Sequence, residues 1–325
     1  MTEKLTIAKA LNRGLRRALQ ADPKVLLAGE DIGKLGGVFR ITEGLQEEFG
    51  ENRVIDSPLA ESGIIGTAVG LCMRGYRPVV EIQFDGFVFP GFAQIVTQVA
   101  KFHMRTGGQQ PMPMVIRIPF GGGIGAVEHH SESPEAYFAH TPGLKVVSCS
   151  NPNDAYWMIQ QAIGSNDPVV FLEPKRRYQT KGEVNFTDKP APMHQAAIAR
   201  YGTDATLLCY GPMVKTCLDA ATVAAEEGTS LEVVDLRTLS PIDWVTVTSS
   251  VRRTKRAIVV HEAPRSLGIG AEVAAKLHEE LFFVMEAPVL RVTGYDMPYP
   301  PARVEEEYLP SVDRILESVD KSLAY

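Results

Sequence analysis

Short apolar runs alternate with amphipathic segments along the first 185 residues. The strand-like runs are VLLAG (25–29), RPVVEIQF (77–84), MVIRIPF (114–120), LKVVSCS (144–150) and PVVFLEP (168–174). Residues 5–19, 61–73 and 92–104 instead carry apolar residues at helical spacing. Asn151 and Pro152 supply an N-cap and a first-turn proline for a further helix. Near-continuous apolar strands separated by helices predict a parallel sheet covered on both faces.

The pattern stops after residue 174 and resumes after residue 200. The segment KRRYQTKGEVNFTDKPAPMHQ is polar and has no sustained period, which favours a linker. The second series consists of ATLLCYG, a helix over 214–227, LEVVDLRT, RAIVVHEA, a helix near 270–283, and VLRVTG. We therefore expect an α/β protein of two doubly wound domains, with residues 1–185 and 201–325 joined by a linker at 186–200.

Composition narrows the class of protein. Of the 325 residues, 45% are apolar and 22% charged, and the net charge of −6 argues against a nucleic acid or a membrane surface as partner. No apolar run approaches the roughly 18 residues that a membrane span needs. The N-terminus lacks the apolar stretch of a secretory signal. Four cysteines lie in apolar segments without a C-x-x-C pair, so we expect a cytoplasmic protein with buried thiols.

A glycine-rich stretch, GGGIG at 121–125, follows a predicted strand as a dinucleotide-binding loop would. The dinucleotide fingerprint requires G-x-G-x-x-G opening a helix, whereas EHHSESP after this stretch is a poor helix start. An NAD-dependent Rossmann oxidoreductase is therefore the alternative from a different class. The interpretation we prefer is a flexible turn that permits close approach of another segment.

Three of the seven histidines fall in VEHHSESPEAYFAH at 127–140. Adjacent histidines point in different directions, so His129 and His130 cannot both face one metal, and no second cluster supplies further ligands. A single histidine that donates or accepts a proton near neutral pH fits better. A plain surface loop is the competing interpretation.

Glu61 is a second candidate, in DSPLAESGIIGTAVGLCM. Ser57 and Pro58 can cap and start a helix, on which Glu61 shares one face with Ile64 and Ile65. A carboxylate on an apolar face is costly without a partner. It is either an N-terminal acid favoured by the helix dipole or a desolvated carboxyl that awaits a hydrogen-bonding ligand.

Six segments in order carry a resemblance to a known family. They are GEDIGKLGGVFRITEGL, DSPLAESGIIGTAVG, EIQFDGFVFPGFAQIV, HSESPEAYFAHTPGLKVV, DPVVFLEPKRRY and VVDLRTLSPID. Over essentially the whole chain, the sequence resembles the β subunit of the thiamine-diphosphate-dependent 2-oxoacid dehydrogenases. The resemblance implies a transketolase-like architecture, in which a pyrimidine-binding domain precedes a transketolase C-terminal domain.

The resemblance also implies roles for the unusual residues. Glu61 matches the carboxylate that hydrogen-bonds the cofactor's pyrimidine ring and favours its imino tautomer. Gln83 and Phe87 match positions that line the cofactor cleft, with Phe87 against the pyrimidine. His130 occupies the HS-x-S position, which implies acid–base catalysis and support of acyl transfer. The implied reaction is decarboxylation of a 2-oxoacid and reductive acylation of a lipoyl group.

Partners follow from the same resemblance. The family's pyrophosphate and magnesium motif, G-D-G followed by paired asparagines, is not found in this chain. It belongs to a separate α subunit, which implies a shared cofactor, an α₂β₂ heterotetramer, and inactivity of the chain alone. A lipoyl acyltransferase is the further partner expected, and a purely non-catalytic scaffold that docks it is the weaker alternative.

Two finer expectations concern an ion and the substrate. A structural potassium ion would be held by the segments that contain the set Met114, Ala162, Ser165 and Asp167, although Asp or Asn is usual at the last two positions. FDGFVFPGF and HSESPEAYFAH resemble the branched-chain (2-oxoisovalerate) enzymes more than the pyruvate enzymes. A pyruvate or acetoin dehydrogenase remains the alternative.

Overall fold

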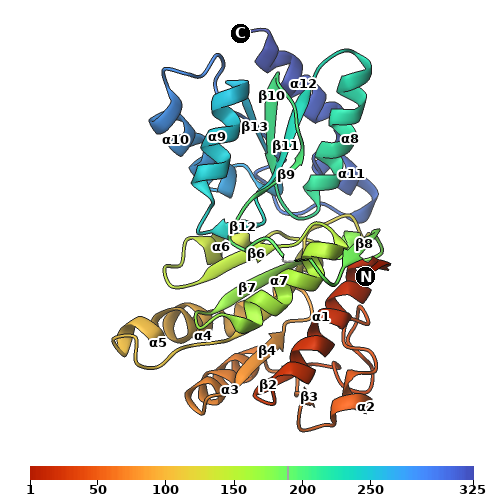
Figure 1. Cartoon of the computed structure of the whole chain (residues 1–325), viewed down its shortest axis with the longest axis vertical. Coiled ribbons are helices and arrows are strands. Elements are labelled where there is room, and N and C mark those ends of the chain that lie inside the picture. The colour runs from red at the N-terminus through yellow and green to blue at the C-terminus, as the bar shows by residue number, and fades with distance from the viewer. Residues whose placement is uncertain (189) are drawn as a thin grey trace.

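The computed structural model describes residues 1–188 and 190–325. Figure 1 shows two lobes stacked along the long axis, the N-terminal one coloured red to yellow-green and the C-terminal one green to blue. The predicted linker at 186–200 contains Lys189, which lies outside the described residues. Two doubly wound α/β lobes confirm the predicted fold class.

The first sheet forms the centre of the N-terminal lobe. In spatial order its strands are β12 (Thr238–Ser240), β6 (Lys145–Ser148), β7 (Val169–Pro174), β5 (Val115–Phe120), β4 (Arg77–Glu81), β2 (Val25–Gly29) and β3 (Val54–Asp56). All neighbouring pairs are parallel except β12 with β6. The central strands are buried along their whole length, which explains their continuous apolar character.

Helices cover both faces of this sheet. One face is covered by α1 (Ile7–Ala21) and α7 (Pro152–Gly164), which pack against each other, and the other by α3 (Glu61–Met73) and α4 (Phe89–Gln94). The run that begins with α4 continues through a π-helical turn (Ile95–Val99) into α5 (Ala100–Arg105). Smaller elements are α2 (Leu45–Phe49) and an antiparallel pair, β1 (Thr2–Thr6) with β8 (Lys181–Asn185).

Local signals explain where the helices begin. The Asn151 side chain accepts a hydrogen bond from the Asp154 N–H at 2.9 Å, so the predicted cap of α7 is confirmed. The predicted start of α3 was wrong: the helix begins at Glu61 with Ala60 as N-cap. Ser57 lies four residues before the helix, and its N–H donates to the Gly29 carbonyl at the end of β2.

The second sheet organises the C-terminal lobe. Its strands, in spatial order, are β14 (Leu290–Gly294), β13 (Ala257–Pro264), β10 (Ala205–Cys209), β11 (Leu231–Asp235) and β9 (Ala197–Arg200). Its helices are α8 (Met213–Glu226), α9 (Trp244–Thr254), α10 (Ile269–Leu281), the short α11 (Glu305–Tyr308), which follows the 3₁₀ turn η5 (Ala302–Val304), and α12 (Val312–Leu323). Residues 197–200, which the sequence pattern placed in the linker, form the antiparallel edge strand β9.

The two lobes are joined by more than the linker. Strand β12 follows β11 in the chain but pairs with β6 of the first sheet, as Figure 1 shows at the boundary between the lobes. One hydrophobic cluster contains Ile65 and Val80 of the first lobe together with Leu208 and Val259 of the second. The lobes therefore share a core.

A buried guanidinium ties together the three central strands of the first sheet. Arg117 of β5, 1% exposed, donates to Glu173 of β7 at 2.6 and 2.9 Å and to Glu81 of β4 at 2.5 Å. The Tyr178 hydroxyl donates to the same Glu173 carboxylate at 2.6 Å. A buried ion network is costly to desolvate, so its value lies in fixing strand positions more than in net stability.

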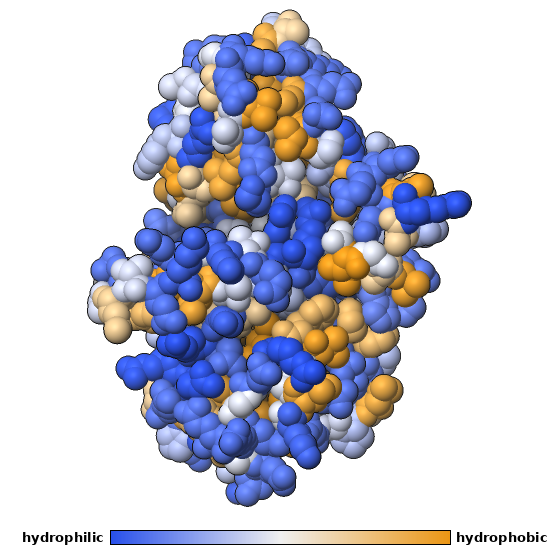
Figure 2. All heavy atoms as spheres, turned by 90° about the vertical axis from the view of Figure 1, so that its right-hand side faces the viewer, coloured by the Kyte–Doolittle hydropathy of each residue, from blue (hydrophilic) through white to orange (hydrophobic). Residues whose placement is uncertain are grey.

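The surface seen in Figure 2 is largely hydrophilic, in agreement with the 22% of charged residues in the sequence. Figure 2 shows one face of both lobes, largely hydrophilic and with scattered hydrophobic patches. Among the described helices, none is both long enough and apolar enough to cross a membrane. All four cysteines are free and buried, as predicted.

The contact between α1 and α7 requires a glycine. A Cβ at Gly14 would lie 2.5 Å from Ile159 Cγ2 and 2.8 Å from the Tyr156 carbonyl oxygen. Gly14→Ala should therefore lower the free energy of unfolding by about 1–3 kcal/mol, measured by urea denaturation. Gly164→Ala, at an open position of α7, is the matched control and should change it by less than about 0.5 kcal/mol. Equal effects of the two substitutions would contradict this packing.

Candidate functional site

The predicted site residues follow the carboxyl ends of parallel strands in the first sheet. Glu61 follows β3, Gln83 and Phe87 follow β4, and His130 follows β5. Because parallel strands all end at one edge of a sheet, segments far apart in sequence meet there, and this edge is where open α/β sheets bind ligands. The fold therefore gathers these four side chains at one edge.

Glu61 is buried at the first position of α3. It is 7% exposed and shares the buried face of the helix with Ile64, Ile65, Ala68 and Cys72, as the spacing predicted. None of the ion pairs or side-chain hydrogen bonds among residues 1–188 and 190–325 engages its carboxylate. The helix N-terminus stabilises an acid there by about 0.3–1 kcal/mol, but a nearly buried carboxylate still needs a hydrogen-bond donor.

A second carboxyl group, which was not predicted from the sequence, lies near Glu61. Glu30 directly follows β2, is 7% exposed, and has one carboxyl oxygen, Oε1, without a hydrogen-bond partner. Burial raises the pKa of Glu30, and the nearby charges of Glu61 and Asp31 raise it further. An acidic residue immediately after the apolar run VLLAG was the available signal.

Gln83, which follows β4, contacts the segment Glu30–Asp31 that follows β2. Its side-chain amide donates to the Glu30 carbonyl and the Asp31 carboxylate, both at 3.4 Å. The contacts are long and weak, and they leave the amide able to turn toward a ligand. Gln83 therefore lies next to Glu30, and its place in a cofactor cleft stays a prediction.

Phe87 and His130 form an aromatic wall. Phe87 lies in the 3₁₀ turn η1 (Asp85–Val88) and His130 in the 3₁₀ turn η3 (Glu128–His130), with ring centroids 5.1 Å apart. Phe84 also contacts His130, with ring centroids 4.1 Å apart, and contacts Phe87 at 5.8 Å. The Nδ1 atom of His130 is buried without a partner. Burial lowers the pKa of His130, and the neighbouring His129 and Lys175 lower it further, so the imidazole is neutral at pH 7.

The GGGIG stretch binds the second lobe. Gly121, Gly123 and Gly125 have positive φ angles of 85°, 79° and 71°, which confirms a glycine-dependent turn. The Gly122 N–H donates to Glu262 at 2.9 Å and the Gly125 N–H to Glu305 at 2.9 Å. These amides are satisfied by carboxylates of the C-terminal lobe, so the loop does not have the free N–H groups that a dinucleotide would need.

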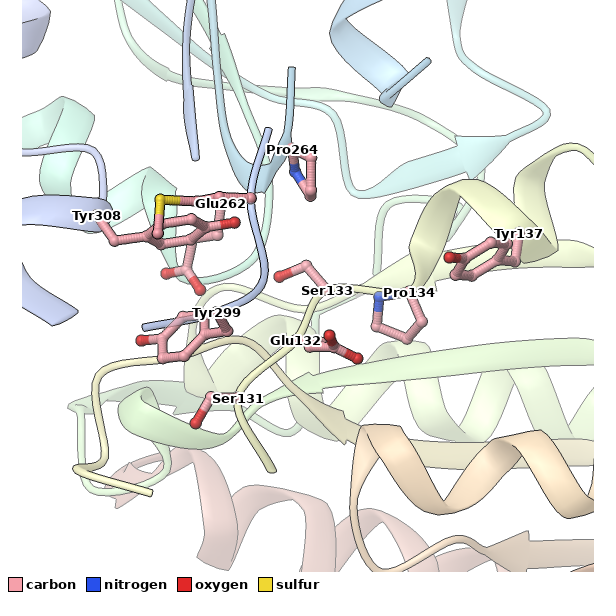
Figure 3. A pocket seen from close by; sticks show the side chains of 10 residues that line it. Ser131, Glu132, Ser133, Pro134, Tyr137, Glu262, Pro264, Tyr299 and Tyr308 are labelled. Carbon is pink, nitrogen blue, oxygen red and sulfur yellow. The ribbon is translucent and has the colours of Figure 1, made fainter. Parts of the chain in front are cut away.

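A cavity of about 90 Å³ lies where the two lobes meet, next to His130 in the chain. Figure 3 shows Ser131 to Pro134 of the first lobe facing Glu262, Tyr299 and Tyr308 of the second. Glu262 also lies 2.7 Å from the guanidinium of Arg176. Polar groups from both lobes therefore enclose the loop that carries His130.

Known proteins match the chain over its whole length. The family described as transketolase, pyrimidine binding domain matches residues 3–181, and that described as transketolase, C-terminal domain matches residues 194–315. The chain is 63% identical over 323 residues to the pyruvate dehydrogenase E1 component subunit beta of Leifsonia xyli, covering 99% of this chain and 96% of that one. The chain belongs to the β-subunit family of the 2-oxoacid dehydrogenases. The predicted family is confirmed.

One further sequence relative and one solved structure are similar to the chain. It is 52% identical over 324 residues to the 3-methyl-2-oxobutanoate dehydrogenase subunit beta of Mycobacterium tuberculosis, covering 99% of this chain and 93% of the relative. A solved split gene transketolase, an inactive beta4 tetramer, has the same fold, with a TM-score of 0.80 at 22% identity over 98% of both chains. The relatives' names therefore divide between two 2-oxoacids.

The site of this β-subunit family member fits the family's cofactor, thiamine diphosphate. Among residues 1–188 and 190–325, no side-chain donor engages the Glu61 carboxylate, and the buried atoms Glu30 Oε1 and His130 Nδ1 have no hydrogen-bond partner. His130 lies beside the ring of Phe87, with the ring centroids 5.1 Å apart, so a flat polar heterocycle at this edge would find both hydrogen-bonding groups and an aromatic surface. In the described parts of the chain, no group of three or more His, Cys, Asp or Glu side chains is placed to hold a metal ion.

The predicted potassium region is the turn between α7 and β7. The Ser165 carbonyl accepts from Arg77 at 3.0 Å, and the Asp167 carboxylate pairs with Lys145 and His103, each at 2.9 Å.

Met114 and Ala162 are the other two residues of the predicted potassium set. Their carbonyls accept N–H donors, Val169 and Ser165 respectively. The potassium site stays a prediction, and the donors already present on this turn do not favour it.

A buried carboxyl group next to the site gives a pH test. Glu135 of α6 (Glu135–Ala139) accepts the Tyr210 hydroxyl at 2.5 Å, and burial raises the pKa of Glu135 to about 7, against the effect of this hydrogen bond. The folded chain therefore holds a proton that the unfolded chain releases above pH 4.5. Stability should fall as pH rises from 4.5 to about 7 and level off above.

Glu135→Gln keeps an oxygen acceptor for Tyr210 and removes the titration. From pH 5 to pH 8 the wild type should lose roughly 1–3 kcal/mol of unfolding free energy relative to this variant, measured by urea denaturation. Glu128→Gln, at an exposed position, is the control and should follow the wild type. Parallel curves for wild type and Glu135→Gln would contradict a buried proton at this position.

Proposed function

We propose that this chain is the β subunit of a cytoplasmic E1 component that acts with an α subunit as an α₂β₂ heterotetramer. The assembly would decarboxylate a 2-oxoacid oxidatively with thiamine diphosphate. It would transfer the acyl group to the lipoyl group of an acyltransferase. The observation that carries the proposal is Glu61, a buried carboxylate that pairs with no side chain in the described part of the chain and lies at the edge where open α/β sheets bind ligands.

Glu61 would hold the cofactor by a hydrogen bond to its pyrimidine ring. When bound, thiamine diphosphate supplies a nucleophilic thiazolium carbon that adds to the keto carbon and accepts the electron pair released with carbon dioxide. Glu30, whose pKa is raised, can keep a proton and so relieve like-charge repulsion with Glu61. The carboxyl pair would thus tolerate burial under a bound ring.

Phe87 and His130 would complete this chain's share of the site. Phe87 would pack against the pyrimidine ring, and Gln83 would line the cleft beside it. His130, neutral at pH 7, can accept or donate a proton during transfer to the lipoyl group, in which the disulfide is reduced as the acyl carbon is oxidised. The resemblance supports assigning the pyrophosphate and magnesium site to the α subunit.

Glu61→Gln keeps the shape of the side chain and removes the carboxylate. In the α/β complex we expect the rate of 2-oxoacid decarboxylation, followed with an artificial electron acceptor, to fall by roughly 100-fold or more. Sedimentation should show an intact heterotetramer, and Glu128→Gln should retain the wild-type rate. A fully active Glu61→Gln complex would rule out the proposed role.

The substrate has two candidates. The segments FDGFVFPGF and HSESPEAYFAH favour a branched-chain 2-oxoacid by resemblance, whereas the 63% identical relative is named for pyruvate. The chain co-expressed with a matching α subunit should be assayed for kcat/KM with 3-methyl-2-oxobutanoate and with pyruvate. A branched pocket should prefer the larger acid by about 10-fold or more.

Each outcome of this assay has a definite meaning. Preference for pyruvate would replace the branched-chain candidate with the second one. No turnover of either acid by an assembled complex would overturn the proposed function. The β chain alone should be inactive with both acids.

A further inference from the structure

A buried ion pair, Lys175 with Asp85, lies next to the loop that carries His130. Lys175 begins the turn η4 (Lys175–Arg177) after β7, and its ammonium contacts the Asp85 carboxylate at the start of η1. Lys175 is 3% exposed and Asp85 1%. The pair bridges the segments that follow β7 and β4, so it spans β5, the strand that leads to His130.

The second oxygen of Asp85 holds the loop that carries His130. It accepts a hydrogen bond from the Glu132 N–H at 2.8 Å. The Glu132 carbonyl in turn accepts the Gly121 N–H at 2.9 Å. The remaining backbone bonds of η3, from His130 to Val127 and from Ser131 to Glu128, are local and do not anchor the loop. Asp85 is therefore one of two hydrogen-bond anchors at Glu132.

Close packing transmits the position of η1 to the histidine loop. A Cβ at Gly86 would lie 2.7 Å from His129 Cβ, so the turn and the loop touch through a glycine. Lys175 Nζ lies 5.6 Å from the centroid of the Phe84 ring, and the His130 ring lies 4.1 Å from the same centroid. Lys175 therefore contacts the Phe84 ring, which in turn contacts the His130 ring.

We propose that Asp85 and Lys175 are positioning residues that set the place of the His130 imidazole. Lys175 fixes the Asp85 carboxylate beneath the loop, and Asp85 fixes the loop through the Glu132 N–H. A buried ion pair stabilises a fold little better than apolar residues of equal volume would. The directional contacts of Asp85 with Lys175 and with the Glu132 N–H therefore call for a functional explanation. The inference rests on the proposed role of His130 in acyl transfer.

Two double variants of the α/β complex separate the hydrogen bond from the charges. Asp85→Asn/Lys175→Met removes both charges and keeps an oxygen acceptor for the Glu132 N–H. Asp85→Leu/Lys175→Met has the same branching at Cγ and no acceptor. Two rates are measured with the 2-oxoacid that the complex uses: decarboxylation with an artificial electron acceptor, and acyl transfer to a free lipoyl domain.

Both variants should decarboxylate within about twofold of wild type, because Glu61 is untouched. The asparagine variant should also retain acyl transfer within about threefold. The leucine variant should lose about 10- to 100-fold in acyl transfer, the scale on which a displacement near 1 Å acts. Equal acyl transfer in the two variants would overturn the positioning role. Asp85→Ala/Lys175→Met replaces the leucine variant if that complex does not assemble.

Two controls make failures distinguishable. His130→Ala should reproduce the selective loss of acyl transfer; if it does not, the proposed role of His130 falls whatever the Asp85 variants do. Asp154→Asn breaks another partly buried ion pair, with Arg237 at 2.9 Å. It should lower the thermal stability of the complex without changing the ratio of the two rates. A changed ratio in Asp154→Asn would show that any damage to buried ion pairs gives the same effect, and would refute a specific role of Asp85.

Discussion

One buried guanidinium in the middle of the first sheet holds the strands that lead to the proposed site in place. Arg117 of β5 reaches carboxylates of both neighbouring strands, Glu81 of β4 and Glu173 of β7. Each of these three strands leads into a segment of the site: β4 into Phe87, β5 into the loop of His130, β7 into Lys175. Because unpaired charges at this depth are costly, the three strand ends keep a fixed relation to one another.

The second lobe completes what the sheet begins. Carboxylates of Glu262 and Glu305 cap the amides of the glycine loop that leads to His130, and strand β12 extends the first sheet. The loop thereby becomes a contact between lobes, which removes the structural basis for a dinucleotide interpretation. The proposed site at the edge of the first lobe therefore depends on residues of both lobes.

Local periodicity predicted much of this. The apolar face that includes Glu61 follows from helical spacing, and the strands follow from continuous apolar runs. Lys175 and Asp85 escaped notice because their pairing depends on the spatial order β4, β5, β7, which no local pattern specifies. Glu30 escaped for the same reason: its proximity to Glu61 requires β2 and β3 to be neighbours.

The most direct test of the central claim is a structure of the α/β complex with thiamine diphosphate bound. We predict that a Glu61 carboxylate oxygen lies within about 3.2 Å of a pyrimidine ring nitrogen, the range of a hydrogen bond, and that Phe87 packs against the ring. A cofactor held elsewhere, or a Glu61 carboxylate bound instead to a side chain of the α subunit, would contradict it.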